Sequence, residues 1–350
     1  MRVLVREPFW GISRKRERAV SSAQANSNTH KENCMHSTAL SGTRKFVRSL
    51  NKGLRPLARV MVWELRRFCA SRLFWLQALG FFCFSLFLAW TQGMPDSFRH
   101  AKGAVVLSGF VAGTSAWGLL LTLPLALVLL VLLLPFITAD GVTRDVSRRT
   151  HELLLTTGLP TWAYVWGRYL IGLVMSLGLA LLMLVAMLGM GWFLHLTVPA
   201  YPSPSIDVVL LLWIGMVVPA TILVSSLSFT LGTLLPRLSL PVKVMILVGW
   251  IVEAVVLPMM FSDTIPPGWY VNWDPTSAVT VLGLLSPYDF SDAAARATSE
   301  AQLQQFLPIV ENKMPALSGW FAPHLLLAGL SLLLVLVASL VFKRSRGMLK

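Results

Sequence analysis

The residues best suited to chemistry in this chain form one short charged run, Arg148-Arg149-Thr150-His151-Glu152. Arginine presents a fork of N–H donors and glutamate presents acceptor oxygens, so a run with both signs of charge suits charge-assisted bonds to another protein. Catalysis is a weaker interpretation, because the run lacks the second histidine of a His-Glu-x-x-His zinc motif. We interpret Arg148, Arg149, His151 and Glu152 as a docking surface, with a solvated turn as the plain alternative.

A second candidate is Glu253, the one acid that we expect inside an apolar span. Carboxylates within a membrane are costly, usually face the interior of a helix bundle and often mark a pathway. Glu253 lies near the outer half of its span, so a snorkelling or structural role is an equal alternative to a role in a pathway.

The sequence contains no motif for a bound cofactor or metal. It lacks the Gly-x-x-x-x-Gly-Lys-Ser/Thr loop that cradles nucleotide phosphates and the Gly-x-Ser-x-Gly turn of serine hydrolases. Its six histidines and its three cysteines have no metal-ligand spacing. His195 and His324 both fall near outer ends of spans and could approach each other. We expect neither cofactor nor metal in this chain, and we expect any ATP site to lie on a partner.

The elements that must position these residues are apolar helices. The chain has 55% hydrophobic and only 13% charged residues, whereas soluble domains have about 25% charged residues. A run of about 20 apolar residues crosses the hydrocarbon core, and backbone groups in lipid must be bonded internally. We predict an all-α integral membrane protein with six transmembrane helices, at about 73–92, 113–137, 168–194, 208–234, 241–261 and 321–342.

The distribution of Lys and Arg predicts the orientation of these spans. An even number of spans places both termini on one side, and all but four of the 30 basic residues fall on that side. The exceptions are Arg99, Lys102, Arg296 and Lys313. The positive-inside rule therefore places the N- and C-termini and the loop 138–168 in the cytoplasm of a cell inner or plasma membrane. The net charge of +14 does not indicate nucleic-acid binding, because the charges cluster at span ends and before the first span.

The segments outside the spans differ in character. Residues 1–54 are basic and polar without an apolar core, which is typical of a disordered cytoplasmic tail. Residues 262–320 form an outer loop too long for a tight turn, so we expect it to be structured, with a helix over 293–306. The membrane domain then covers residues 55–345.

A short helix is predicted on each side of the first hairpin of spans. In 56–72, Leu57, Met61, Leu65 and Phe68 recur on one helical face, which predicts an in-plane helix that bends near Ser71 into the first span. A plain basic flank is the alternative. Residues 142–155 can form a short amphipathic helix, which Gly158 and Pro160 end; Thr161 could cap the next helix.

This order of elements resembles the ABC-2 type permease family. In that family the second and third spans are joined by a run similar to Glu-Arg, Thr-Leu-Glu-Leu-Leu-Leu, small residues, Pro, a short amphipathic stretch and Gly-Lys. The matching positions here are Thr150, Glu152, Leu153, Leu154, Leu155, Pro160 and Gly167. Arg168 stands in place of the Lys, His151 replaces the leucine before the Glu, and Asp145 is the nearest acid to the Glu-Arg start. The matching motif covers about 20 residues and the layout covers about 55–345.

The resemblance implies the membrane half of an ABC transporter. The loop after the second span would act as a coupling helix in a groove of a separate ATPase subunit. The permease would pair with a second copy or a paralogue, and ATP hydrolysis on the partner would drive alternating access, with export favoured. An intramembrane enzyme and a membrane assembly or scaffold protein remain the alternatives.

Overall fold

The computed structural model describes residues 54–91, 112–140, 159–198, 201–261, 266–285, 288 and 299–347, and these ranges contain helices and no strand. The chain divides into two units, Met1–Pro56 and Leu57–Lys350, and the contacts discussed here belong to the second. Six helices in the described ranges are long and apolar enough to cross a membrane, which confirms the six predicted spans.

The spans are built from ten α-helical and π-helical pieces. The first three are α2 (Arg72–Thr91), α3 (Ala116–Thr138) and α6 (Thr161–Thr197). The fourth joins α7 (Ile206–Leu212), a π-helical turn (Trp213–Val217) and α8 (Val218–Leu234); the fifth joins α9 (Ser239–Ile251), a π-helical turn (Val252–Val256) and α10 (Leu257–Met260). The sixth is α15 (Phe321–Gly347). Thr161 is the first helical residue of α6 and not its cap, because Pro160 occupies the cap position.

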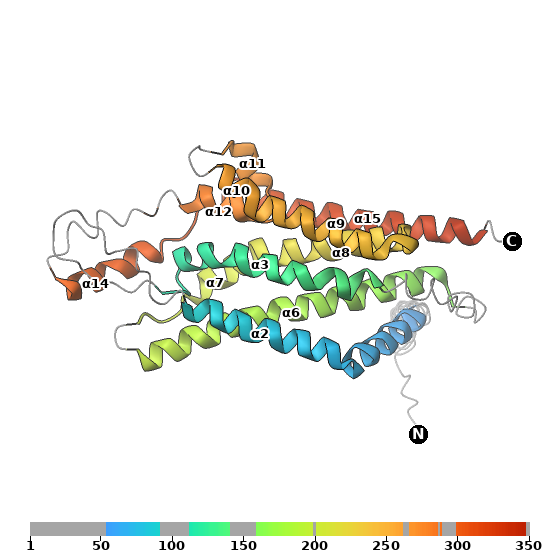
Figure 1. Ribbon diagram of the computed structural model, residues 1–350, viewed down its shortest axis with the longest axis horizontal. Coiled ribbons are helices and arrows are strands. Elements are labelled where there is room, and N and C mark those ends of the chain that lie inside the picture. The colour runs from blue at the N-terminus through green and yellow to red at the C-terminus, as the bar shows by residue number, and fades with distance from the viewer. Residues whose placement is uncertain are drawn as a thin grey trace, which may run out of the picture. The chain divides into compact units, whose positions relative to one another are not determined.

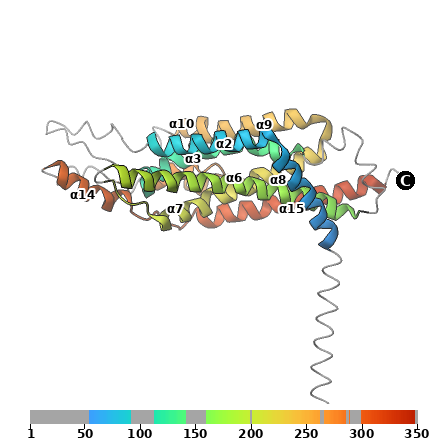
Figure 2. The same ribbon diagram turned by 90° about the horizontal axis from the view of Figure 1, so that it is seen from below.

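The spans run side by side, with α8 among the others (Figures 1 and 2). Helix α8 contacts α15, α3, α6 and α9. The most apolar window of the fourth span is 61% buried, against 28% for the fifth and the sixth, so the fourth span is central and the last two are peripheral. Leucines of α3 fill the interior beside it: Leu119, Leu120, Leu127, Leu130 and Leu134 are at most 1% exposed.

One end of the bundle, which we call the basic end, carries the start of α6 and the ends of α3, α8 and α15. The ring of Tyr164 stacks on that of Phe342 there, with 6.1 Å between centroids. A Cβ on Gly232 of α8 would lie 2.7 Å from the carbonyl oxygen of Ala139. The backbone of α8 therefore contacts the backbone at the end of α3. Small residues of this kind let membrane helices approach closely. That the basic end is cytoplasmic stays a prediction.

The N-terminal helix bends where the sequence predicts a bend. A helix covers residues 54–70, Ser71 interrupts it, and α2 begins at Arg72 in a new direction (Figure 1). The hydroxyl of Ser71 accepts a hydrogen bond from the Phe74 N–H at 3.3 Å, which satisfies one free donor of the new helix. That the helix lies in the plane of the membrane stays a prediction.

The predicted apolar face of this helix differs from the side that packs. Val60 and Glu64 are buried, whereas Leu65 of the predicted face is 39% exposed. The helix is therefore turned so that a carboxylate faces the bundle. The pattern of apolar residues did not indicate this, because the charge is paired only in the folded chain.

Both π-helical turns precede a proline, which accounts for them. Proline has no N–H, so the carbonyl four residues earlier loses its helical donor. Pro219 releases the carbonyl of Gly215 in this way, and the His324 ring lies 3.2 Å from that oxygen through Nδ1. Pro258 stands in the same relation to Ala254 in the fifth span.

Three short helices occupy the described parts of the connection between the last two spans: α11 (Gly268–Trp273), α12 (Ala278–Leu285) and α14 (Glu300–Glu311). The buried Asp274 anchors α12, since its Oδ2 accepts the N–H groups of Val279 at 2.6 Å and Thr280 at 3.3 Å. Helix α14 starts at Glu300, capped by Ser299, and runs beyond the predicted end at 306. Residues 289–298 lie outside the described residues.

We predict that Gly232→Ala destabilises the protein by about 1–3 kcal/mol, because the new methyl group would press against backbone that cannot yield. Gly80→Ala is the matched control, since a Cβ on Gly80 meets nothing within 4 Å. Thermal unfolding of the purified protein in detergent measures both variants. Equal unfolding temperatures for the two variants would contradict the close contact of α8 with the end of α3.

Candidate functional site

The predicted docking residues Arg148, Arg149, His151 and Glu152 lie in 141–158, outside the described residues. The structure describes the residues on both sides of this segment. Asp140 precedes it, and its carboxylate lies 2.6 Å from the Lys243 ammonium on α9. Leu159 follows it and packs against an aromatic cluster that includes Tyr164 and Phe229. The segment is thus tied to packed helices where it leaves α3 and where it enters α6.

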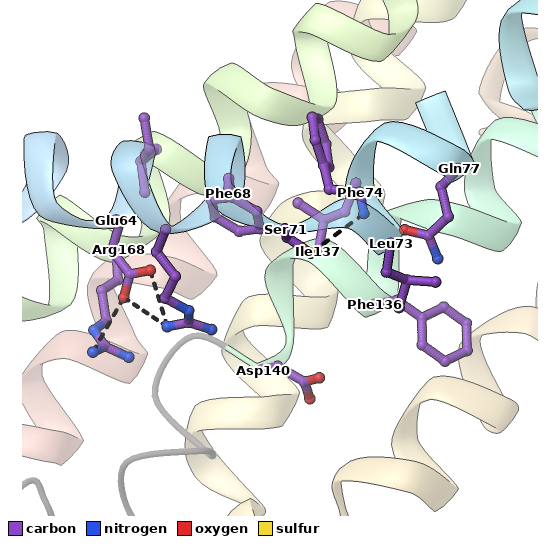
Figure 3. Close-up of a pocket in the computed structure, with 12 residues that line it drawn as sticks. Glu64, Phe68, Ser71, Leu73, Phe74, Gln77, Phe136, Ile137, Asp140 and Arg168 are labelled. Carbon is purple, nitrogen blue, oxygen red and sulfur yellow. Dashed lines mark hydrogen bonds and ion pairs between the residues drawn. The ribbon is translucent and has the colours of Figure 1, made fainter. Parts of the chain in front are cut away.

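A buried ion pair lies two turns into α6. The Arg168 guanidinium is 3.1 Å from the Glu64 carboxylate, and the two side chains are 1% and 2% exposed. Glu64 also accepts hydrogen bonds from Arg67 at 3.0 and 3.2 Å, so one carboxylate lies between two guanidinium groups (Figure 3). Taking charges out of water is costly, so removing one member leaves a charge that the interior cannot solvate.

Aromatic rings and a glycine complete the setting of Arg168. Its guanidinium carbon lies 4.8 Å from the centre of the Tyr164 ring and 5.4 Å from that of Trp63, within the range of cation–π attraction. A Cβ on Gly167 would lie 2.9 Å from Val60. Gly167 therefore lets the N-terminal helix approach α6 closely enough for Glu64 to reach Arg168.

Sequence reasoning missed this pair. The sequence indicated Gly167 and Arg168 only as the residues at the Gly-Lys position of the family pattern. It indicated no role for Glu64. One signal was present: Glu64 is the only acid in 54–72, a stretch with several arginines. A lone acid in a basic amphipathic helix indicates a partner, although the sequence does not say which arginine it meets.

Glu253 belongs to a different region. It lies half-buried in the π-helical turn of the fifth span, beside the short helices α10 and α12. Asp274 is close enough to interact with it electrostatically, but both oxygens of Asp274 already accept hydrogen bonds from its own turn and from α12. The structure does not bring Glu253 to the buried ion pair at the basic end.

His195 and His324, which could have approached each other, contact different carbonyl groups. His195 Nδ1 lies 2.7 Å from the carbonyl oxygen of Tyr201, whereas His324 Nδ1 lies 3.2 Å from that of Gly215. Within the described ranges, no three side chains from His, Cys, Asp and Glu gather as a metal site would require.

A second buried carboxylate lies at the opposite end of the bundle. Glu311, the last residue of α14, is fully buried, and its Oε2 accepts the Ala112 N–H at 2.9 Å. Its Oε1 has no hydrogen-bond partner. Burial raises the pKa of Glu311 to about 7, although the bond from Ala112 acts in the opposite direction. The Gly113 N–H donates to the Tyr201 hydroxyl at 3.0 Å, so the turn before α3 is held from two sides.

Comparisons of this chain with protein-family models, with curated proteins and with solved structures find no match. The fold defines a class of helical protein with six helices that are long and apolar enough to cross a membrane. The ABC-2 type permease family stays a resemblance carried by the residues of 150–168 and by the order of the elements.

We predict that Glu64→Ala or Arg168→Ala alone destabilises the protein by roughly 3–5 kcal/mol, because each leaves a buried charge without its partner. The double variant should cost less than the sum, with a coupling of about 0.5–3 kcal/mol in a double-mutant cycle. Arg59→Ala is the control, since Arg59 is exposed on the same helix. Additive losses, measured by unfolding in detergent, would show that the pair does not hold the helix to α6.

We predict that stability falls as pH rises from about 5 to 7.5, through Glu311. The folded state keeps a proton on this carboxyl up to a pKa of about 7, whereas the unfolded chain releases it near 4.3. Its contribution is fully present below the unfolded pKa and is lost as pH rises through 7, on the order of 3 kcal/mol. Glu311→Gln should unfold at a temperature that varies less over this range, and an unchanged pH profile would contradict the assignment.

Proposed function

We propose that this chain is the permease subunit of an ATP-driven ABC transporter, an exporter that works with a separate ATPase subunit. Two such permease chains, two copies or one with a paralogue, would enclose a pathway in the bilayer. The substrate would cross by alternating access. In this proposal 141–158 is the coupling segment, the basic end is cytoplasmic, and no cofactor belongs to this chain.

The observation that carries the proposal is the way in which 141–158 is attached. Asp140 is bonded to Lys243 on α9, and α6 carries Arg168 bonded to Glu64 on the N-terminal helix. A displacement of the segment would therefore act on α3, α6, α9 and the N-terminal helix together. A solvated turn without a mechanical role does not require buried charges beside it.

The resemblance supplies the partner. In this sequence the run from Thr150 to Arg168 is similar to the family's coupling segment, and no phosphate loop occurs anywhere in the chain. A permease of this kind depends on a second subunit to bind and hydrolyse ATP. Arg148, Arg149, His151 and Glu152 would contact that subunit, and charges of both signs would fix the register of docking.

Co-purification tests the proposal. We expect the tagged chain, solubilised gently from its native membrane, to carry a stoichiometric subunit that has a phosphate loop and ATPase activity. Arg149→Glu with Glu152→Arg should lower the partner's recovery and its ATPase activity, because each charge would face a like charge on the ATPase. Insertion into the membrane should not change, and Arg237→Glu, a basic residue in another loop at the basic end, is the control for loop charge.

Two outcomes would count against the proposal. A chain that purifies without any nucleotide-binding subunit would favour the enzyme or the scaffold alternative. A partner that is retained at the wild-type level in the Arg149→Glu, Glu152→Arg variant would remove the charged run from the docking surface. Activity on a substrate without nucleotide would support the enzyme alternative directly.

A further inference from the structure

A cavity of about 250 Å³ lies at the basic end, beneath the bend at Ser71 (Figure 3). Its walls come from the N-terminal helix, the start of α2, the end of α3 and the first half of α6. Two spans end at this level, since α2 begins at Arg72 and α3 ends at Thr138. The cavity therefore lies at the boundary between apolar spans and polar segments, which is the depth of the glycerol and headgroup region of a bilayer.

The charged groups that line the cavity balance, and they are already bonded. Glu64 and Asp140 contribute two negative charges. Arg67 and Arg168 contribute two positive charges. Glu64 lies between the two guanidinium groups, and Asp140 is bonded to Lys243. A ligand with a net charge would lose its hydration here without meeting an uncompensated opposite charge, so the lining favours an uncharged ligand.

The apolar part of the wall opens toward lipid. Leu73 is 63% exposed and Phe136 is 46% exposed, and both belong to helices that are apolar enough to span a membrane. A hydrocarbon chain that lay between these two side chains would connect the cavity with the bilayer. The other apolar residues of the lining are Phe68, Phe74, Ile137 and Ile171.

Two uncharged polar groups of the lining have unused hydrogen-bonding capacity. The Gln77 carboxamide has no hydrogen-bond partner among the described residues, although it presents both donors and an acceptor. It lies one turn after Leu73, on the same face of α2 (Figure 3). The Ser71 hydroxyl accepts the Phe74 N–H at 3.3 Å, and its own O–H donates to no described residue. Polar groups at the edge of the hydrocarbon are costly without partners, so both favour a ligand that brings hydroxyl or ester oxygens.

We propose that this cavity binds an uncharged acylglycerol, with its hydroxyl and ester oxygens at Gln77 and Ser71 and its acyl chain between Leu73 and Phe136. A glycerol hydroxyl both donates and accepts, which matches the two sides of a carboxamide. The lipid fills the space beneath the bend, where the N-terminal helix meets α2 and α3. The site does not depend on the proposed transport function.

Lipid-dependent thermal unfolding tests the site. The whole chain is placed in nanodiscs of dioleoylphosphatidylcholine, and its unfolding temperature is measured as a second lipid is added. We expect 1-monooleoylglycerol to raise this temperature in a saturable way, since a ligand of the folded state stabilises it. Methyl oleate has the same chain without a hydroxyl, and 1-oleoyl-lysophosphatidylglycerol adds one negative charge; neither should produce the saturable rise.

Gln77→Leu separates a ligand contact from a structural role. The amide has no partner in the folded protein to lose, so this variant should unfold at the wild-type temperature or above it when no monooleoylglycerol is present. It should require about threefold to tenfold more monooleoylglycerol for half of the rise, because one neutral hydrogen bond is lost.

A pair of tryptophan variants tests the mouth of the cavity. Leu73→Trp should raise the requirement for monooleoylglycerol about tenfold, because a larger side chain occupies the entrance. Leu76→Trp is the matched control: Leu76 is 66% exposed on the same span and does not line the cavity. Its requirement should stay within about a factor of two of the wild type, as for other surface substitutions.

Four results would overturn the proposal. Equal stabilisation by the lysophosphatidylglycerol would remove the selection for an uncharged head, and equal stabilisation by methyl oleate would remove the role of the hydroxyls. Unchanged binding in both Gln77→Leu and Leu73→Trp would place the lipid elsewhere on the protein. Stabilisation by free glycerol that Gln77→Leu abolishes would show that the cavity takes a soluble polyol and not a lipid.

Discussion

The buried bond between Glu64 and Arg168 is the constraint on which the basic end depends. Two charges in an apolar interior are tolerated only together, so the N-terminal helix must lie with Glu64 toward α6. That orientation places Val60 against Gly167 and directs Arg67 and Phe68 into the space below the bend. The same bond therefore decides which face of the helix packs and which of its side chains point into the space below the bend.

Asp140, which precedes the segment 141–158, is bonded to Lys243 of α9, and Arg168 of α6 is bonded to Glu64. These bonds matter for any function that moves the segment. Lipid does not draw membrane helices together as water does, so their mutual positions depend on close packing and on polar bonds. Ala139 against Gly232 and Asp140 against Lys243 fix the end of α3 on one side. Arg168 fixes α6 on the other. Under the proposed function these contacts would transmit force from an ATPase to the spans.

The opposite end is held by backbone groups rather than by ion pairs. Pro219 leaves the carbonyl of Gly215 without a helical donor, and the His324 ring lies beside that oxygen. Asp274 accepts hydrogen bonds from N–H groups at the start of α12. Glu311 holds Ala112 through a carboxyl that keeps its proton to about pH 7. Irregular backbone at such depth requires partners for its released groups. The carbonyl that Pro219 releases in the fourth span thus lies within hydrogen-bonding distance of the His324 ring.

The sequence by itself determined the six spans, the bend at Ser71 and the concentration of basic residues at one end, because each depends on local composition: the length of an apolar run, the interruption of a helical pattern, and charge next to a span. The outer helix was predicted over 293–306, whereas α14 covers Glu300–Glu311 and starts after the cap at Ser299. Only the tertiary structure decided that Glu64 meets Arg168, that Val60 and not Leu65 packs inward, and that Asp140 meets Lys243. Such pairs join residues about a hundred positions apart, and a pattern of neighbours along the chain carries no record of which distant charge will share the same buried space.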